Sequence, residues 1–160
     1  MAFQWFGDGD VMRFTPTGPD ASLEHTKNRL ATYREHQAAH GFSKWLVQER
    51  LSGEAIGDSG LLVLPESAGI DLGFRFLKRF WSRGFATEAA AAWIDAAFTL
   101  LALQRLTAFC HPKNLASVRV LANVGFRRVG EGRVMGMEAI SFALNEIEYQ
   151  NAARRTTRSS

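Results

Sequence analysis

The stretch that decides the fold reads Phe80-Trp81-Ser82-Arg83-Gly84-Phe85-Ala86-Thr87-Glu88-Ala89 and joins a predicted strand to a predicted helix. Residues 70–77 before it alternate apolar and polar side chains, which is typical of a strand with one buried face. Residues 85–101 are rich in alanine and carry apolar side chains at helical spacing. The free N–H groups at a helix start, with Arg79 and Arg83 beside them, would suit a phosphate group. A plain strand–helix connection fits the same residues, and the stretch contains neither GxxxxGK[ST] nor GxGxxG.

The sequence on either side of this stretch predicts one sheet flanked by helices. Strands are expected at 43–50, 56–64, 70–77, 105–110, 126–134 and 138–144, and helices at 17–41, 85–101 and 115–124, with a last helical turn at 145–148. Short turns join the first three strands into an antiparallel meander. The strand–helix–strand step from 70 to 110 favours two parallel neighbours with a crossover helix. The predicted fold class is therefore α/β (α+β), with a mixed, mostly antiparallel, twisted sheet.

Length and composition limit the class of protein. The 160 residues are enough for one domain, and the apolar fraction of 46% and charged fraction of 22% are ordinary for a globular chain. No run of about 18 apolar residues occurs, so no membrane span is predicted. A single cysteine, Cys110, cannot form an internal disulfide, which favours a cytoplasmic location. We expect one domain over residues 1–150 and a basic, disordered tail over residues 151–160.

The charge of the chain is unevenly distributed. Residues 1–71 carry six basic and ten acidic side chains, whereas residues 72–136 carry ten basic and three acidic ones. A solvated surface explains such a basic segment, and so does a site for a phosphorylated ligand. Nucleic acid is a weaker explanation, because the basic residues are not interleaved with the aromatic platform that RNA stacking requires.

Two motifs resemble a known family. Gly73-Phe74-Arg75-Phe76 followed by the 80–89 stretch resembles the acetyl-CoA-binding region of GNAT N-acetyltransferases, in particular the RimJ/RimL type. Gly84 and Ala86 match the family's Q/R-x-x-G-x-G/A loop, and Trp81 stands where the RimJ/RimL branch commonly has tryptophan. About 30 residues on, Asn114 to Leu121 followed by Gly125-Phe126 resembles the family's N-x-x-S-x-x-x-L…GF run. The resemblance covers roughly residues 11–149.

The resemblance implies a set of site residues. Backbone groups of one strand end would pair with the pantetheine arm, backbone N–H groups of the loop would hold the pyrophosphate, and one asparagine would orient the cofactor. In that order these are Phe76, Leu77 and Lys78; Arg83, Gly84, Phe85, Ala86 and Thr87; and Asn114. Ser117 would protonate the departing sulfur, although a serine in a first helical turn can equally be a cap. Asp71 would receive the amine proton, or it is simply a solvated strand residue.

The chain also departs from the family pattern at its start. The family normally has an edge strand and a first helix before a segment like residues 10–15, which lies close to the first residue here. Either the sheet lacks its first edge strand and its first helix, or the true start of the chain lies upstream. Such a sheet would have a newly exposed edge and a less complete acceptor pocket.

Other reactive side chains give no competing site. Cys110 and His111 are neighbours on a predicted strand, so their side chains point to opposite faces and cannot form a thiol–imidazole pair. His36 and His40 share a helix face, but Gln37 breaks the H-E-x-x-H zinc pattern. No metal is expected, and the acetyl group would move directly from cofactor to acceptor.

The resulting prediction is an acetyl-CoA-dependent N-acetyltransferase that acts on a primary amine, either a protein N-terminus or a small molecule. The alternative is a CoA-binding sensor that no longer catalyses. Neither nucleic acid nor a membrane is an expected partner, and a homodimer is compatible with the sequence.

Overall fold

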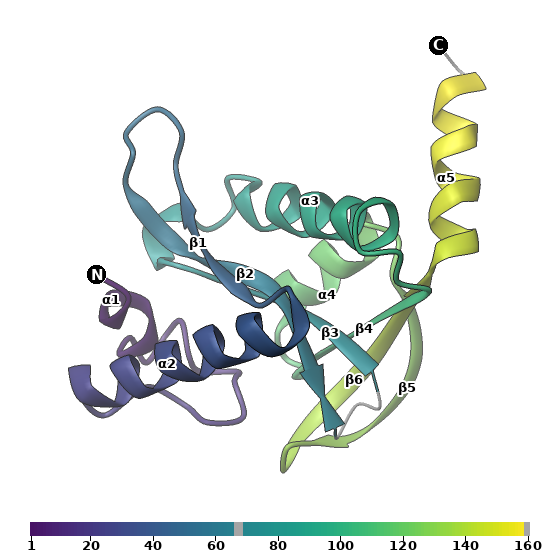
Figure 1. Ribbon diagram of the computed structural model, residues 1–160. Helices are drawn as coiled ribbons and strands as arrows, with labels where there is room; N and C mark the ends of the chain where they lie inside the picture. The colour runs from purple at the N-terminus through teal and green to yellow at the C-terminus, as the bar shows by residue number, and fades with distance from the viewer. Residues whose placement is uncertain (66–68, 159–160) are drawn as a thin grey trace.

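Six strands form one sheet in the computed structural model, which describes residues 1–65 and 69–158 (Figure 1). Their order is β1-β2-β3-β4-β6-β5, and every neighbouring pair is antiparallel except β3 and β4. The strands are β1 (Lys44–Gln48), β2 (Ala55–Leu64), β3 (Gly69–Phe76), β4 (Arg105–Cys110), β5 (Arg127–Val134) and β6 (Met137–Asn145). The mixed, mostly antiparallel sheet predicted from the sequence is therefore confirmed.

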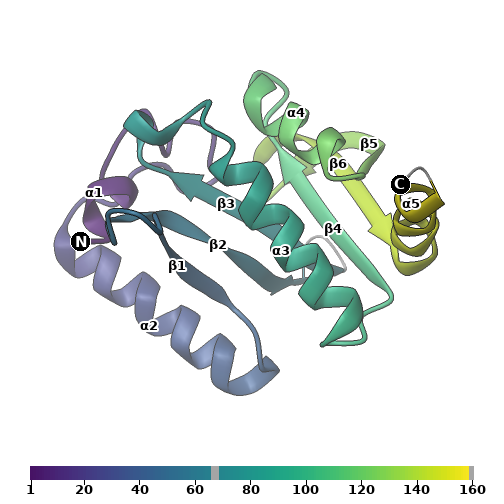
Figure 2. The same cartoon turned by 90° about the horizontal axis from the view of Figure 1, so that it is seen from above.

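Helices lie on both faces of this sheet (Figures 1 and 2). They are α1 (Phe3–Phe6), α2 (Leu23–His40), α3 (Phe85–Thr99), α4 (Leu115–Asn123) and α5 (Glu146–Arg158), with a 3₁₀ turn η2 (Lys78–Phe80). On one face, α3 and α4 pack over the sheet. On the other, α2 lies on the β1 side of the sheet and reaches β3 through the Tyr33 hydroxyl, which accepts a 2.8 Å hydrogen bond from Arg75. The crossover helix expected between two parallel strands is α3.

Two groups of buried side chains make the core. The larger group lies between the sheet and helices α3 and α4, and includes Leu72, Ile94, Leu106, Leu121 and Phe142. The smaller group surrounds the N-terminal segment, and includes Trp5, Phe6, Met12, Ile56, Phe76 and Phe80. Because the second group fixes residues 1–14 against β2 and β3, the N-terminal segment is part of the folded domain.

The parallel joint between β3 and β4 is short. Among the described residues it contains a single facing pair, Asp71 and Thr107, whereas β2 and β3 pair over eight positions. Beyond that pair, towards Phe76 on β3 and Cys110 on β4, the two strands are no longer paired with each other. The sheet therefore opens at the carboxyl ends of its two central strands, which is where α/β proteins commonly bind ligands.

The ends of the chain differ from the prediction. The short α1 and η2 were not predicted, because four residues and three residues are too few to show a helical period. Helix α5 runs to Arg158, so residues 151–158 are helical where a disordered tail was expected.

Among the described strands, none pairs with the outer side of β1, so β1 is an edge. None of the described helices is long and apolar enough to cross a bilayer.

Candidate functional site

The loop after η2 presents the start of α3 to a cavity. Gly84 is the N-cap residue, with φ of 85° and ψ of −4°, a conformation that glycine adopts without the penalty other residues carry. The first backbone bond of the helix runs from Glu88 N–H to the Gly84 carbonyl, at 3.0 Å. The N–H groups of residues 85–87 therefore have no acceptor within the helix. Such a helix start attracts an anionic group.

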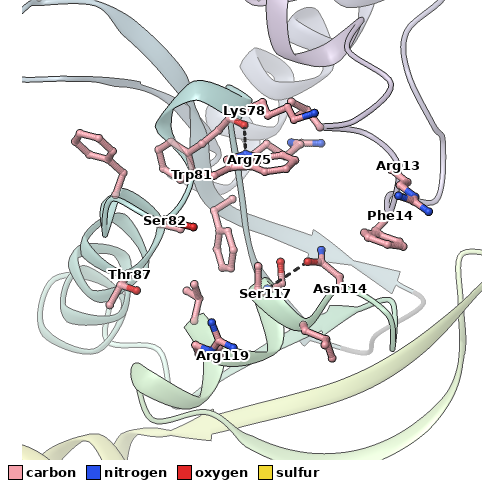
Figure 3. A pocket seen from close by; sticks show the side chains of 18 of the residues that line it. Arg13, Phe14, Arg75, Lys78, Trp81, Ser82, Thr87, Asn114, Ser117 and Arg119 are labelled. Carbon is pink, nitrogen blue, oxygen red and sulfur yellow. Dashed lines mark hydrogen bonds between the residues drawn. The ribbon is translucent and has the colours of Figure 1, made fainter.

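This larger cavity has a volume of about 790 Å³ and lies where β3 and β4 separate (Figure 3). Its walls come from the N-terminal segment, the end of β3, the loop before α3 and the first turns of α4. Of the residues predicted to bind a cofactor or to act in catalysis, those lining it are Phe76, Lys78, Gly84, Phe85, Ala86, Thr87, Asn114 and Ser117. Segments far apart in sequence thus converge on one cavity.

The charge around the larger cavity is positive. Five basic side chains and one acidic one are among its lining residues: Arg13, Arg75, Lys78, Lys113, Arg119 and the acid Asp10. The charge of Asp10 is already balanced, because its carboxylate forms a 2.6 Å ion pair with Lys78. Lys113 and Arg119 are exposed at the start of α4. An anionic ligand with several charges would be attracted here.

Helix α4 supplies a hydroxyl to the same cavity. Asn114 is its N-cap, and its Oδ1 accepts a 3.2 Å hydrogen bond from the backbone N–H of Ser117 (Figure 3). The cap is therefore Asn114, and the Ser117 hydroxyl is free of the capping role that the sequence left open. Among the described residues, no hydrogen bond formed by that hydroxyl is found. Ser117 is half-buried and can donate to a ligand in the cavity.

Three predicted residues make contacts that the sequence did not indicate. Leu77 is 4% exposed and does not line the larger cavity, and its N–H donates to the Ile56 carbonyl at 2.8 Å. Arg83 turns away from the cavity and lies 3.7 Å from a Glu49 carboxylate oxygen. The carbonyl of Phe76 accepts a 2.7 Å bond from the Trp81 indole. Trp81 therefore fixes the loop to the end of β3.

A smaller cavity of about 250 Å³ continues from the larger one. The residues that line both are Val11, Phe14, Phe74, Arg75, Asn114 and Ser117. Asp71 and Lys44 line only the smaller cavity, which lies towards α2. Asp71 and Ser117, the two predicted catalytic residues, therefore line one continuous space, with Ser117 at the junction.

Asp71 is a buried carboxylic acid without a full set of partners. The residue is 6% exposed, and its Oδ1 has no hydrogen-bond partner among the described residues. Burial raises its pKa to about 7, and the Lys44 ammonium and the Thr107 hydroxyl limit the rise. The alternative of a solvated strand residue is therefore wrong. A carboxylate with a pKa near neutrality is suited to accept a proton.

Several lining residues were missed by the sequence reasoning. The walls formed by Arg13 and Phe14 come from the N-terminal segment, which carries no motif. Lys44, which lies in the smaller cavity, is placed there by strand register: it pairs with Gly60, which in turn pairs with Gly73. The signal in the sequence that could have indicated the position of Lys44 is the pair of glycines, Gly60 and Gly73, which lie opposite it on the two neighbouring predicted strands.

Cysteine and histidine side chains give no second site. Cys110 is buried and burial raises the pKa of its thiol to about 11, so it is protonated at neutral pH. His111 stacks on Phe14 with ring centroids 5.1 Å apart. No group of three or more His, Cys, Asp and Glu side chains able to hold a metal ion occurs within residues 1–65 and 69–158.

Comparisons with known proteins agree with this geometry. Residues 1–127 match the family model described as "Acetyltransferase (GNAT) domain". The chain is 37% identical over 128 residues to the uncharacterized N-acetyltransferase YnaD of Bacillus subtilis (strain 168), which covers 80% of this chain and 72% of that protein.

Two solved structures share the fold. A GNAT-family acetyltransferase from Bacillus anthracis superposes with a TM-score of 0.77 at 24% identity, covering 91% of this chain and 87% of that one. Spermidine N-acetyltransferase from Vibrio cholerae, in complex with CoA and spermine, superposes with a TM-score of 0.75 at 15% identity, covering 92% and 89%.

Proposed function

Because the chain belongs to the GNAT acetyltransferase family and is an acyltransferase, we propose that it moves an acetyl group from acetyl-CoA directly to a primary amine. The observation that carries the proposal is the continuous space in which the α3 start, Ser117 and Asp71 meet. One end of it suits a phosphorylated cofactor and the other end holds a base.

We propose that the larger cavity holds acetyl-CoA. The N–H groups of residues 85–87 would receive the pyrophosphate, because they lack helical acceptors and lie at the positive end of α3. Lys113 and Arg119 would lie near the remaining phosphate charge. The CoA complex of the Vibrio cholerae enzyme, which shares this fold, supports that use of the cavity. The open end of β3 would face the pantetheine arm.

The chemistry requires an acceptor amine without its extra proton. In the proposed reaction Asp71 takes a proton from the acceptor ammonium, and the freed lone pair attacks the thioester carbonyl. The new C–N bond forms as the C–S bond breaks, and the Ser117 hydroxyl donates a proton to the departing thiolate. The pKa of Asp71 near 7 allows it to accept this proton at neutral pH.

Direct transfer is preferred to a covalent acetyl-cysteine. Cys110 belongs to the larger core group and lines the smaller cavity, and burial raises the pKa of its thiol to about 11. A thiol in that state is a poor nucleophile at neutral pH. The acceptor amine can therefore react with the thioester without an enzyme-bound intermediate.

The RimJ/RimL branch is the finer assignment that we propose. Its support is Trp81, whose indole bonds to the Phe76 carbonyl and so has a structural role in the loop. The acceptor would then be a protein N-terminus, or else a small amine that fits the smaller cavity.

Two measurements test the function. Acetyl-CoA should raise the melting temperature of the chain by mass action, and no shift at millimolar ligand would remove the cofactor proposal. At least one member of a panel of amines, which includes peptides with N-terminal Ala or Ser and polyamines, should then release free CoA. Cofactor binding without CoA release from any amine would favour a sensor over an enzyme.

A further inference from the structure

The smaller cavity contains a buried cation that is not paired. Three basic side chains line it, but two are already balanced by carboxylates behind the cavity wall. Arg75 donates from Nε and Nη2 to Asp58, at 3.1 and 2.8 Å. Arg29 is paired with the buried Asp20. The third is Lys44, and none of the ion pairs formed among the described residues includes it.

Strand register places the Lys44 ammonium between two charged neighbours. Asp71, Gly73 and Arg75 point to one face of β3, because alternate residues of a strand share a face. Lys44 crosses Gly60 to reach that face, and its Nζ lies where a Cβ of Gly73 would be. The ammonium thus lies level with Gly73, two residues from Asp71, which is about 7 Å along β3 at roughly 3.3 Å per residue.

The surroundings of Lys44 favour an anion. Burial, and after it the nearby Arg75, lower the pKa of Lys44 to about 8, while Asp58 and Asp71 oppose the change. An added carboxylate would compensate the buried ammonium. An added cation would meet three basic side chains and a single acid among the described residues that line the cavity.

We infer that the smaller cavity binds an acceptor amine that also carries a carboxylate, with the carboxylate on Lys44 and the amino group beside Asp71. The inference rests on the proposed function and names its substrate class. An amine and a carboxylate a few bonds apart span about 7 Å when each makes a hydrogen bond at its outer side. A volume of about 250 Å³ suits a small molecule of this kind. A polyamine brings two or more positive charges and no carboxylate, so it does not fit.

Paired acceptors test this directly. Free amino acids and their carboxamides have the same amine and differ in the carboxylate alone, so the ratio of their kcat/KM values reports its recognition. We expect the acids to exceed the amides and spermidine by about tenfold or more, which corresponds to about 1.4 kcal/mol of recognition. Lys44→Met should bring the acid-to-amide ratio close to one. Lys27→Met, which removes an exposed lysine paired with Glu24, should leave the ratio unchanged.

The outcomes separate this inference from the function on which it rests. The inference would be overturned if the wild type used amides or spermidine with the same kcat/KM as the acids, or if the acid-to-amide ratio did not change in Lys44→Met. Either result would leave the proposed acetyltransferase function in place. A further outcome is that acetyl-CoA binds but no amine is acetylated. In that case, amino acids that raise the melting temperature of the CoA complex, with carboxamides that do not, would support the inference. Equal or no stabilisation would overturn it. Absence of any acetyl-CoA effect on melting would instead overturn the proposed function.

Discussion

The two cavities that meet at Ser117 differ in the groups that line them. The larger one offers backbone N–H groups of α3 and exposed basic side chains. The smaller one offers Asp71 and Lys44, whose pKa values of about 7 and about 8 lie in that range. Binding in the larger cavity should therefore respond to salt, and chemistry in the smaller cavity should respond to pH. Four substitutions, ordered from the largest expected effect, test this division.

The largest effect is expected from Asp71→Asn in the smaller cavity. The amide keeps the shape of the side chain but cannot accept the proton, so kcat/KM should fall about 10³-fold. In the wild type, activity should decline as the pH drops below about 7, because Asp71 becomes protonated. The variant should lose this pH dependence and keep the wild-type Kd for acetyl-CoA. A variant as active as the wild type would remove Asp71 from the reaction.

The same substitution has an independent readout in stability. Asp71 has a pKa of about 7 when folded and an ordinary value of 3.8, so the folded chain binds more protons between these values. The free energy of unfolding should therefore decrease as the pH rises from about 4 to about 7. Denaturant titrations across this range should show a smaller decrease for Asp71→Asn. An identical slope in both proteins would contradict the raised pKa.

Ser117→Ala tests the junction of the two cavities. Removing the hydroxyl should lower kcat roughly 10²-fold, because the thiolate then leaves without a proton donor. The acetyl-CoA Kd, measured by calorimetry, should stay the same, because the cap of α4 is supplied by Asn114 and not by this hydroxyl. A weakened Kd with unchanged kcat would assign Ser117 to cofactor binding instead.

Gly84→Ala tests the larger cavity without touching a charge. A Cβ at φ of 85° carries a strain of about 1–2 kcal/mol, which the turn can relieve by moving the N–H groups of α3. Acetyl-CoA affinity should fall by up to about tenfold. Gly41→Ala is a matched control, because Gly41 ends α2 at φ of 79° and lines neither cavity. It should lose similar stability and keep its affinity; equal losses of affinity would contradict a local role for Gly84.

The smallest effect is expected from Arg119→Ala. An exposed cation near a phosphate contributes about 1 kcal/mol or less, so the acetyl-CoA Kd should rise about twofold to fivefold at low salt. The difference from wild type should vanish in high salt. Arg105→Ala, also in the basic segment but outside both cavities, should have no effect. A Kd that does not depend on salt would break the proposed division between the cavities.

The larger cavity could be predicted from the sequence because its determinants are local. A glycine before an alanine-rich helix and an asparagine three residues before Ser117 are each contained in one short stretch. The smaller cavity could not be predicted in the same way. The position of Lys44 depends on two registers and on the missing side chains of Gly60 and Gly73, which only pairing brings together. Asp71 is buried in a cavity whose walls include residues of the N-terminal segment and of α2, which are far from it in sequence.

The single residue pair between β3 and β4 also affects how the molecule opens. Strands β1–β3 form one antiparallel ladder and β4–β6 another, and the strand hydrogen bonding between them is limited to the Asp71–Thr107 position. Helix α3, which packs on β2 and β3 and contacts α4, also bridges the joint (Figure 2). We expect native-state hydrogen exchange to resolve the ladders as two cooperative units with separate opening free energies. A cofactor bound across the joint would couple them, so that their amide protons would then exchange with one common free energy.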